Sequence, residues 1–83
     1  MNQEKFLKLK ELFSFVERTV SSDLSGEDQY GLVFNKSCSA AIMSLYEFEY
    51  YEPDTSYEDD VMAFYFAFKD EMEKLEKVAP FPD

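Results

Sequence analysis

Apolar side chains recur every three or four residues along most of this chain, and this helical period is the feature that most limits how it can fold. The first stripe lies in residues 2–20. Its members are Phe6, Leu9, Phe13, Val16 and Val20, with Leu12 and Phe15 at its edge. Such a stripe predicts an amphipathic helix that buries one face.

A second stripe begins at Ser37 and predicts a helix that runs to about Tyr51. Its members are Cys38, Ala41, Ile42, Leu45 and Phe48. The residues before it are ambiguous. Ser25 is a good N-cap, so residues 25–28 form a turn or the start of a helix. The apolar run of residues 30–34 fits a strand or a buried helical turn, and we favour a helical or irregular conformation because no other segment alternates with a period of two.

A third helix is predicted after Pro53, which cannot continue the second one comfortably. Thr55 and Ser56 are both suitable N-caps, each with an acidic residue three positions later. The expected core stripe is Tyr57, Val61, Phe64, Phe68, Met72 and Leu75, and the aromatic surface is spread further by Tyr65 and Phe66. Residues 79–83 contain two prolines and form a tail that either packs through Phe81 or frays.

These elements predict one domain, residues 1–83, of the all-α class: a small bundle of three main helices with a short irregular segment between the first and second. The content of hydrophobic residues, 46%, is well above that of disordered chains. Cys38 is the one cysteine, so no intramolecular disulfide is expected, and a reducing, cytoplasmic location is predicted. No apolar stretch is long enough for a membrane span and no signal peptide is recognisable, so we expect a soluble protein.

The groups that most enzymes and cofactor sites need are missing from the composition. The chain has no histidine, and its two glycines, Gly26 and Gly31, cannot form a dinucleotide- or nucleotide-binding loop. The aspartates and glutamates around residues 54–60 lack the spacing of an EF-hand. Cys38 lies on the apolar stripe, where a buried, inert thiol is expected. We therefore predict neither an enzyme nor a cofactor or metal site.

Acidic residues outnumber basic ones by 18 to 8, giving a formal net charge of -10. Residues 23–68 carry ten of the acidic residues and only one basic residue, Lys36, and no basic residue lies between Lys36 and Lys69. If the second and third helices form a hairpin, its turn carries the densest acidic cluster, threaded with tyrosines. The predicted partner-binding residues are Glu47, Glu49, Tyr50, Tyr51, Glu52, Asp54, Tyr57, Glu58, Asp59 and Asp60. The alternative is a solvated acidic face that keeps a small bundle soluble.

The run Tyr51-Glu52-Pro53-Asp54, followed by Tyr57-Glu58-Asp59-Asp60 and a final amphipathic helix, is similar to a segment of the colicin D-type immunity proteins. The resemblance implies a small acidic helical inhibitor that covers the basic active site of a tRNA-cleaving toxin. Residues 23–34 depart from that pattern, because they are too short for an equivalent second helix. The size and charge of the chain also resemble those of phage-encoded anti-CRISPR and anti-restriction proteins that mimic nucleic acid.

Both resemblances imply binding to the basic, nucleic-acid-binding surface of an enzyme, and they differ only in the target. The acidic field favours such a surface and disfavours direct contact with nucleic acid or an anionic membrane. We therefore predict an inhibitor of a nuclease or of a CRISPR or restriction effector, which acts by charge mimicry and steric occlusion. The alternatives are an immunity protein or antitoxin against a ribonuclease, and a helical adaptor that forms a homodimer through its aromatic third helix.

Overall fold

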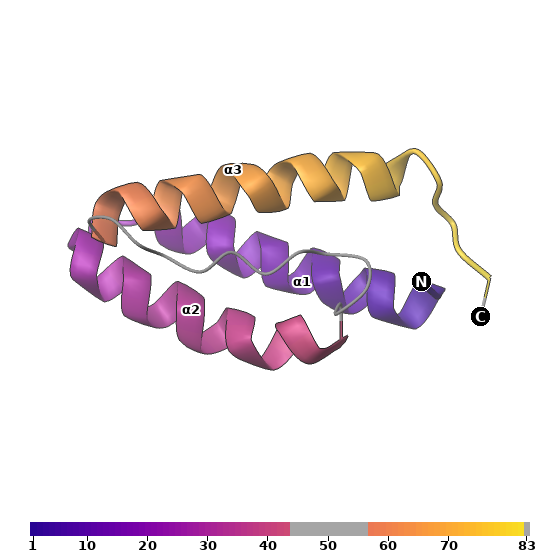
Figure 1. Ribbon diagram of the computed structural model, residues 1–83, viewed down its shortest axis with the longest axis horizontal. Helices are drawn as coiled ribbons and strands as arrows, with labels where there is room; N and C mark the ends of the chain where they lie inside the picture. The colour runs from indigo at the N-terminus through magenta and orange to yellow at the C-terminus, as the bar shows by residue number, and fades with distance from the viewer. Residues whose placement is uncertain (44–56, 83) are drawn as a thin grey trace.

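The computed structural model describes residues 1–43 and 57–82, but not the side chains of residues 37–43, 57, 58 and 60. Within these residues the chain forms three α-helices and no strand (Figure 1). They are α1 (Gln3–Val20), α2 (Gly26–Met43) and α3 (Tyr57–Glu76). The predicted all-α bundle of three main helices is confirmed, and the short irregular connection between the first two helices comprises residues 21–25.

The second helix starts eleven residues earlier than its apolar stripe predicted, at Gly26 instead of Ser37. Ser25 caps it. The Asp28 backbone N–H donates a hydrogen bond to Ser25 Oγ at 3.3 Å, and the Ser25 hydroxyl donates one to the Asp28 carboxylate at 2.9 Å. This reciprocal arrangement satisfies a backbone donor that a helix start otherwise leaves open. The predicted end near Tyr51 lies outside the described residues.

Residues 30–34 lie inside α2, which excludes the strand and irregular alternatives for them. Residues 26–34 form the first half of α2, so the helix-start alternative for residues 25–28 is confirmed. Val33 and Phe34 are buried, and the Phe34 ring lies 5.0 Å from that of Phe64 in α3. Burial of this apolar pair against α3 stabilises the helical conformation despite the glycine at position 31.

The helix α1 is antiparallel to both of the others. Against α3, Lys10 pairs with Glu76 at 3.4 Å and Glu17 accepts a hydrogen bond from Tyr65 at 3.0 Å. Against α2, the Lys36 ammonium lies 5.5 Å from the Phe15 ring centroid. Nearer the C-terminus of α1, the Gln29 side chain donates to the Val20 carbonyl.

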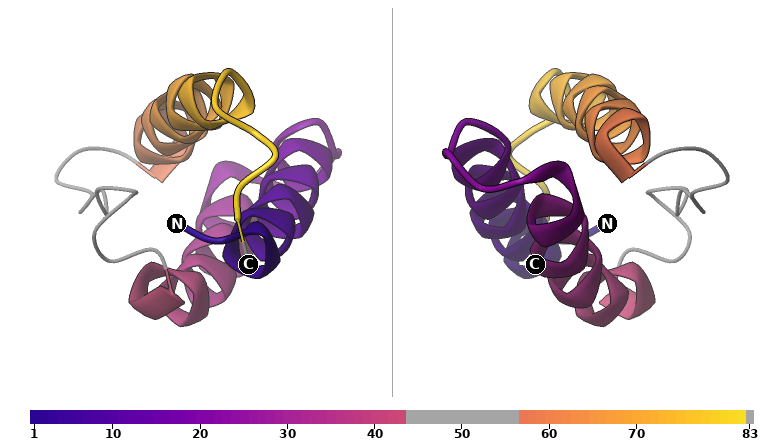
Figure 2. Two further views of the ribbon diagram at one scale, coloured as in Figure 1. Left: turned by 90° about the vertical axis from the view of Figure 1, so that its right-hand side faces the viewer. Right: turned by 90° about the vertical axis from the view of Figure 1, so that its left-hand side faces the viewer.

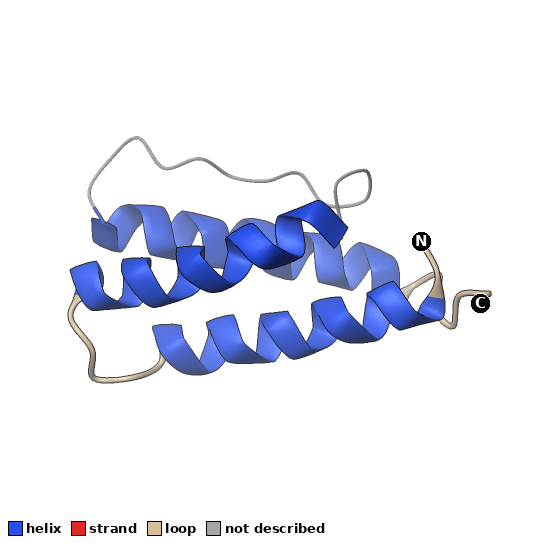
Figure 3. Cartoon of the chain, turned by 90° about the horizontal axis from the view of Figure 1, so that it is seen from below, coloured by secondary structure: helices blue, strands red, loops and turns tan. Residues whose placement is uncertain are grey.

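Because α1 is antiparallel to both α2 and α3, these two helices are parallel and both begin at the same end of the bundle (Figure 1). The C-terminus of α2 and the N-terminus of α3 lie at opposite ends. The hairpin of second and third helices, on which the predicted acidic turn depended, therefore does not form. The N-terminus and the C-terminal tail share the other end of the bundle (Figure 3).

The core lies between the three helices and matches the predicted stripes closely. Its buried members are Phe6, Leu9, Leu12, Val16, Val33, Phe34, Val61, Phe64, Phe68 and Met72. Phe13 and Val20, expected in the stripe of α1, are partly buried at its margin, where the Phe13 ring contacts Phe68 edge-on at 5.3 Å. Tyr57 and the second predicted stripe, Cys38 included, lie outside the described side chains.

The C-terminal tail packs against the start of α1. The Phe81 backbone N–H donates a hydrogen bond to Gln3 Oε1 at 2.8 Å, and the Phe81 ring meets the Phe6 ring edge-on at 5.2 Å. Of the two alternatives for the tail, packing through Phe81 is the one observed. The tail thereby covers the end of the core at Phe6, which is 2% exposed.

Candidate functional site

One end of the bundle brings together the end of α1 and the beginnings of α2 and α3, as the right-hand view of Figure 2 shows. We call this region, residues 17–29 and 57–60, the acidic end. It carries seven acidic residues and one basic residue, Arg18, a formal charge of -6. Asp23, Glu27, Asp28 and Asp59 are exposed. The parallel arrangement of α2 and α3 places their acidic first turns at one pole of the molecule.

Part of this acidity has a structural reason. Each helix presents a partial positive charge at its N-terminus, and acidic side chains in the first turn are stabilising there. Because α2 and α3 are parallel, their two positive N-termini lie at the same end of the bundle and repel each other. Acidic residues in both first turns offset this repulsion between the N-termini. Asp28 also serves the cap of α2 through its bond with Ser25.

The remaining charge of the acidic end has little local compensation. Among the described residues, neither Asp23 nor Glu27 takes part in an ion pair. Arg18 extends along its own helix, where its Nε donates to the Ser14 carbonyl at 3.3 Å. At Asp23 and Glu27 the acidic end therefore projects a negative field that no described basic residue neutralises through an ion pair.

The opposite end of the bundle is different, because acidic and basic residues are interspersed there and three of its lysines form ion pairs. Lys8 pairs with Glu4 at 3.4 Å, and Lys10 joins Glu76 at the same distance. Lys74 contacts both Asp70 and Glu71, at 3.3 and 3.6 Å. These carboxylates hold the pKa of Lys74 above its ordinary value, chiefly through the hydrogen bond with Asp70. Within residues 1–43 and 57–82, the excess of negative charge is thus concentrated at the acidic end.

Only part of the predicted partner-binding set falls within the described residues. Glu47, Glu49, Tyr50, Tyr51, Glu52 and Asp54 lie outside them. Tyr57, Glu58 and Asp60 lie in the first turn of α3, but their side chains are not described. Asp59, in the same turn, is exposed at the acidic end.

Sequence reasoning missed that Asp23, Glu27 and Asp28 belong to the same pole as Asp59. In the sequence they lie 31 to 36 positions before Asp59. The sequence did contain a signal for the α2 part of the acidic end, because Ser25 with Asp28 three residues later is a helix-start pattern. The parallel orientation of α2 and α3, which unites the two halves, has no local sequence signature.

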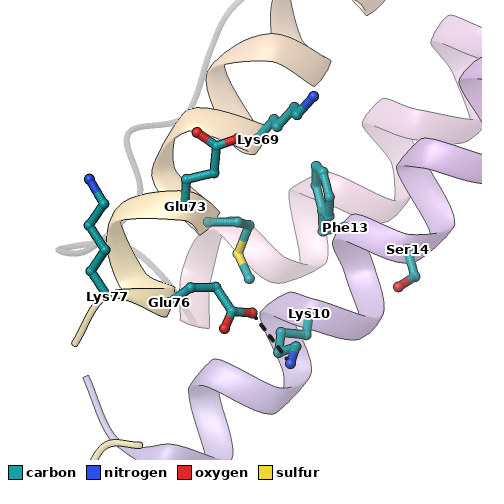
Figure 4. A pocket seen from close by; sticks show the side chains of 8 residues that line it. Lys10, Phe13, Ser14, Lys69, Glu73, Glu76 and Lys77 are labelled. Carbon is teal, nitrogen blue, oxygen red and sulfur yellow. Dashed lines mark ion pairs between the residues drawn. The ribbon is translucent and has the colours of Figure 1, made fainter. Parts of the chain in front are cut away.

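A groove of about 470 Å³ runs between α1 and α3 on the side of the paired charges (Figure 4). Phe13 and Met72 supply its apolar lining, and the Lys10–Glu76 ion pair links the two helices there. The other lining residues are Ser14, Lys69, Glu73 and Lys77. Both members of the ion pair are about half exposed, so the pair contributes little to stability. The groove combines both signs of charge, unlike the acidic end.

Tyr65 links α3 to α1 beside the acidic end and has a perturbed titration. Its hydroxyl donates to Glu17 Oε2 at 3.0 Å, and this bond, with lesser effects of desolvation and of the Glu17 charge, raises the pKa of Tyr65 above its ordinary value of 10.0. The phenol ring also stacks on Phe13, with centroids 5.8 Å apart. Because the folded-state pKa is the higher one, the contribution to stability is complete below pH 10 and is lost as the pH rises through the folded-state pKa.

The Glu17→Gln variant is expected to lower the pKa of Tyr65 toward 10, because an amide oxygen accepts a weaker hydrogen bond from the phenol than a carboxylate does and carries no charge to disfavour the phenolate. An NMR titration of the Tyr65 ring between about pH 8 and 12 measures it, with Tyr65→Phe used to assign the resonance. An unchanged pKa in Glu17→Gln would contradict the assignment of Glu17 as the cause.

Neither a metal site nor a membrane span is found in the described part of the chain. No three histidine, cysteine, aspartate or glutamate side chains there are grouped so as to hold a metal ion. None of the helices combines the length and the apolar composition that crossing a bilayer requires, over the residues described.

Comparisons with protein-family models, with curated proteins and with solved structures gave no significant match. The resemblances to immunity proteins and to nucleic-acid mimics stay predictions. The charge and geometry of the acidic end are therefore the features that bear most directly on function.

Proposed function

We propose that this protein binds the basic, nucleic-acid-binding surface of an enzyme through its acidic end and blocks that surface. The observation that supports the proposal most strongly is the polarity of charge. Seven acidic residues face one basic residue at the acidic end, whereas at the opposite end Lys8, Lys10 and Lys74 each pair with a carboxylate. A field of this kind steers a basic partner to one pole of the molecule.

The geometry of the acidic end suits a surface that normally holds a phosphate backbone. Duplex DNA presents one negative charge per roughly 1.7 Å of axis, and proteins meet it with rows of lysine and arginine. The first turns of two parallel helices offer carboxylates on neighbouring rigid elements, with Asp23 on the connection beside them. Dispersed carboxylates on helices can occupy a row of cationic sites without folding on binding, which keeps the entropic cost low.

The class of target separates the two forms of this proposal. In the first form the target is a nuclease or a CRISPR or restriction effector, and the protein acts as a nucleic-acid mimic. In the second the target is a ribonuclease toxin, and the protein acts as an immunity protein or antitoxin. Both forms require occlusion of a basic site by the acidic end, so one set of charge variants tests them together.

The test compares two variants with the same change in net charge. In the first, Asp23, Glu27 and Asp60 of the acidic end are replaced by lysine. In the matched control, three acidic residues away from that end, Glu4, Glu11 and Glu73, are replaced by lysine. Glu4 lies in the first turn of α1, so the control also perturbs one helix start. Circular dichroism of both variants verifies that the helices persist.

Each tagged protein is used to capture partners from a lysate of its source cells, and the affinity for the captured partner is then measured. The acidic-end variant is expected to bind at least about tenfold more weakly, mainly through slower association, and the control nearly as well as the unmodified protein. Binding by the unmodified protein should weaken as salt rises. Equal losses in the two variants, or a captured partner that is not a basic nucleic-acid-binding protein, would refute the proposal.

A further inference from the structure

The outer face of α3 carries an exposed apolar patch. Among the described aromatic rings, that of Phe66 contacts only Tyr65 of the same helix, at the edge of the core, with ring centroids 5.3 Å apart. Phe66 is 57% exposed and Met62, one turn earlier, is 38% exposed. Ala63 and Ala67 are exposed beside them. The residues of α3 that fill the core lie on the opposite side of the helix, at Val61, Phe64, Phe68 and Met72, so the patch is not part of the core that α3 shares with α1 and α2.

The spacing of four residues on this outer face is symmetric. Its members, separated by three, four and three residues, are Asp59, Met62, Phe66 and Lys69. Their positions are therefore symmetric about position 64. These intervals keep all four within one stripe of an α-helix. The two inner members are apolar, and the two outer members carry opposite charges. All four are exposed, and Lys69, at the edge of the stripe, also lines the groove between α1 and α3.

We propose that this stripe pairs two copies of the chain, with the two α3 helices antiparallel about a two-fold axis near residue 64. In that register Met62 of each copy lies level with Phe66 of the other, and Asp59 lies level with Lys69. The two-fold axis generates each contact twice, as a closed symmetric interface requires. Ala63 and Ala67 leave room for the helices to approach within the usual 8–10 Å.

The charges favour a second copy over an arbitrary apolar partner. Across the antiparallel pair the Asp59 carboxylate meets the Lys69 ammonium of the other copy on both sides of the apolar centre, which selects this register. A parallel pair would place Asp59 beside Asp59 and Lys69 beside Lys69. The thioether of Met62 against the Phe66 ring adds a sulfur–aromatic contact.

The interface is small, and its size sets the expected affinity. Residues 59–69 of α3 span about 16 Å at 1.5 Å per residue. A single helix pair of this length buries less than the roughly 1,200–2,000 Å² of stable complexes, so we expect a dissociation constant on the order of 10–100 µM. The dimer carries its two acidic ends at opposite ends of the pair, because the α3 helices are antiparallel. It can therefore present both to partners.

Sedimentation equilibrium of the full chain from about 5 to 500 µM tests the dimer, because this range brackets the expected dissociation constant. The unmodified protein should pass from monomer to dimer. Phe66→Asp should remain monomeric over the range with its helical circular dichroism intact, since the side chain is exposed. Leu7→Asp, an equally conservative control at a 52% exposed position of α1, should dimerise like the unmodified protein.

The register is tested by exchanging the two charges. Asp59→Lys and Lys69→Asp, each alone, create two like-charge contacts across the antiparallel pair and should weaken the dimer at least about fivefold. The double variant D59K/K69D restores opposite charges and should dimerise as the unmodified protein does. A monomer up to 500 µM, dimerisation by Phe66→Asp, or a double variant no better than the singles would overturn the proposal.

The test of the dimer and the test of the proposed function are independent, although both concern the same chain. The charge variant used for the acidic end leaves Asp59, Met62, Phe66 and Lys69 unchanged. Loss of partner binding in that variant therefore says nothing of the dimer, and a monomeric Phe66→Asp variant keeps the complete acidic end.

Discussion

Replacing Phe64 by alanine is expected to lower the free energy of unfolding by about 3–5 kcal/mol. The ring is completely buried between α2 and α3, with centroids 5.0 Å from Phe34 and 5.7 Å from Phe68. Removal of the ring loses the free energy of its apolar burial and leaves a cavity. The cavity cannot close easily, because α2 and α3 are each also packed against α1. Because a domain of this size has a total stability of about 4–12 kcal/mol, the loss is a large part of it.

Phe66→Ala is the matched control, since it deletes the same ring from the same helix two positions away. Phe66 is 57% exposed, and its removal should cost less than about 1 kcal/mol. Urea denaturation followed by circular dichroism, at a concentration well below that of the proposed dimer, measures both variants. Similar losses for the two would contradict the assignment of the inner and outer faces of α3.

Placing a charge at position 33 is expected to unfold most of the molecule. Val33 is fully buried on α2, and an aspartate there would bury an unpaired carboxylate at a cost of at least about 4 kcal/mol. Leu32→Asp is the control, because the neighbouring side chain is 46% exposed and an aspartate there stays in water. The pair tests the segment whose conformation the sequence left ambiguous.

The expected result for Val33→Asp is a loss of helical signal and of the thermal transition, and for Leu32→Asp a nearly unchanged transition. Circular dichroism between about 10 and 90 °C records both. Tolerance of aspartate at both positions would show that residues 30–34 do not form a buried helical turn.

The first and third helices could be predicted from the sequence because their apolar residues keep a helical period. The structure buries Phe6, Leu9 and Val16 in α1 as the period indicated. In α3 it buries Val61, Phe64, Phe68 and Met72 likewise. The local pattern is sufficient to predict such helices, because the apolar residues that recur with a helical period are the ones that become buried.

The start of α2 was only one of two alternatives for residues 25–28, because Gly31 interrupts the short apolar run that follows. Glycine within a helix costs about 1 kcal/mol relative to alanine, so the local signal was weak. A Cβ at position 31 would meet no atom within 4 Å, so packing does not require glycine there. Tertiary contacts of Val33 and Phe34 decide the conformation, and these are long-range in sequence.

The acidic end could be predicted only in part. The excess of carboxylates was visible in the composition, and Asp59 was among the residues chosen. Its union with Asp23 and Glu27 depends on α2 and α3 being parallel, whereas a hairpin would have separated their first turns. The orientation of the helices depends on how the three apolar stripes pack together, and no local sequence motif predicts that packing.

The most direct test of the proposed inhibition is competition with nucleic acid for the captured enzyme. Fluorescence anisotropy of a labelled DNA or RNA duplex bound to that enzyme is followed while this protein is added. We predict that the anisotropy falls to the value of the free duplex, and that the variant with lysine at positions 23, 27 and 60 is at least about tenfold less effective. A rise in anisotropy, which would report a ternary complex, or no change at saturating protein would contradict the account.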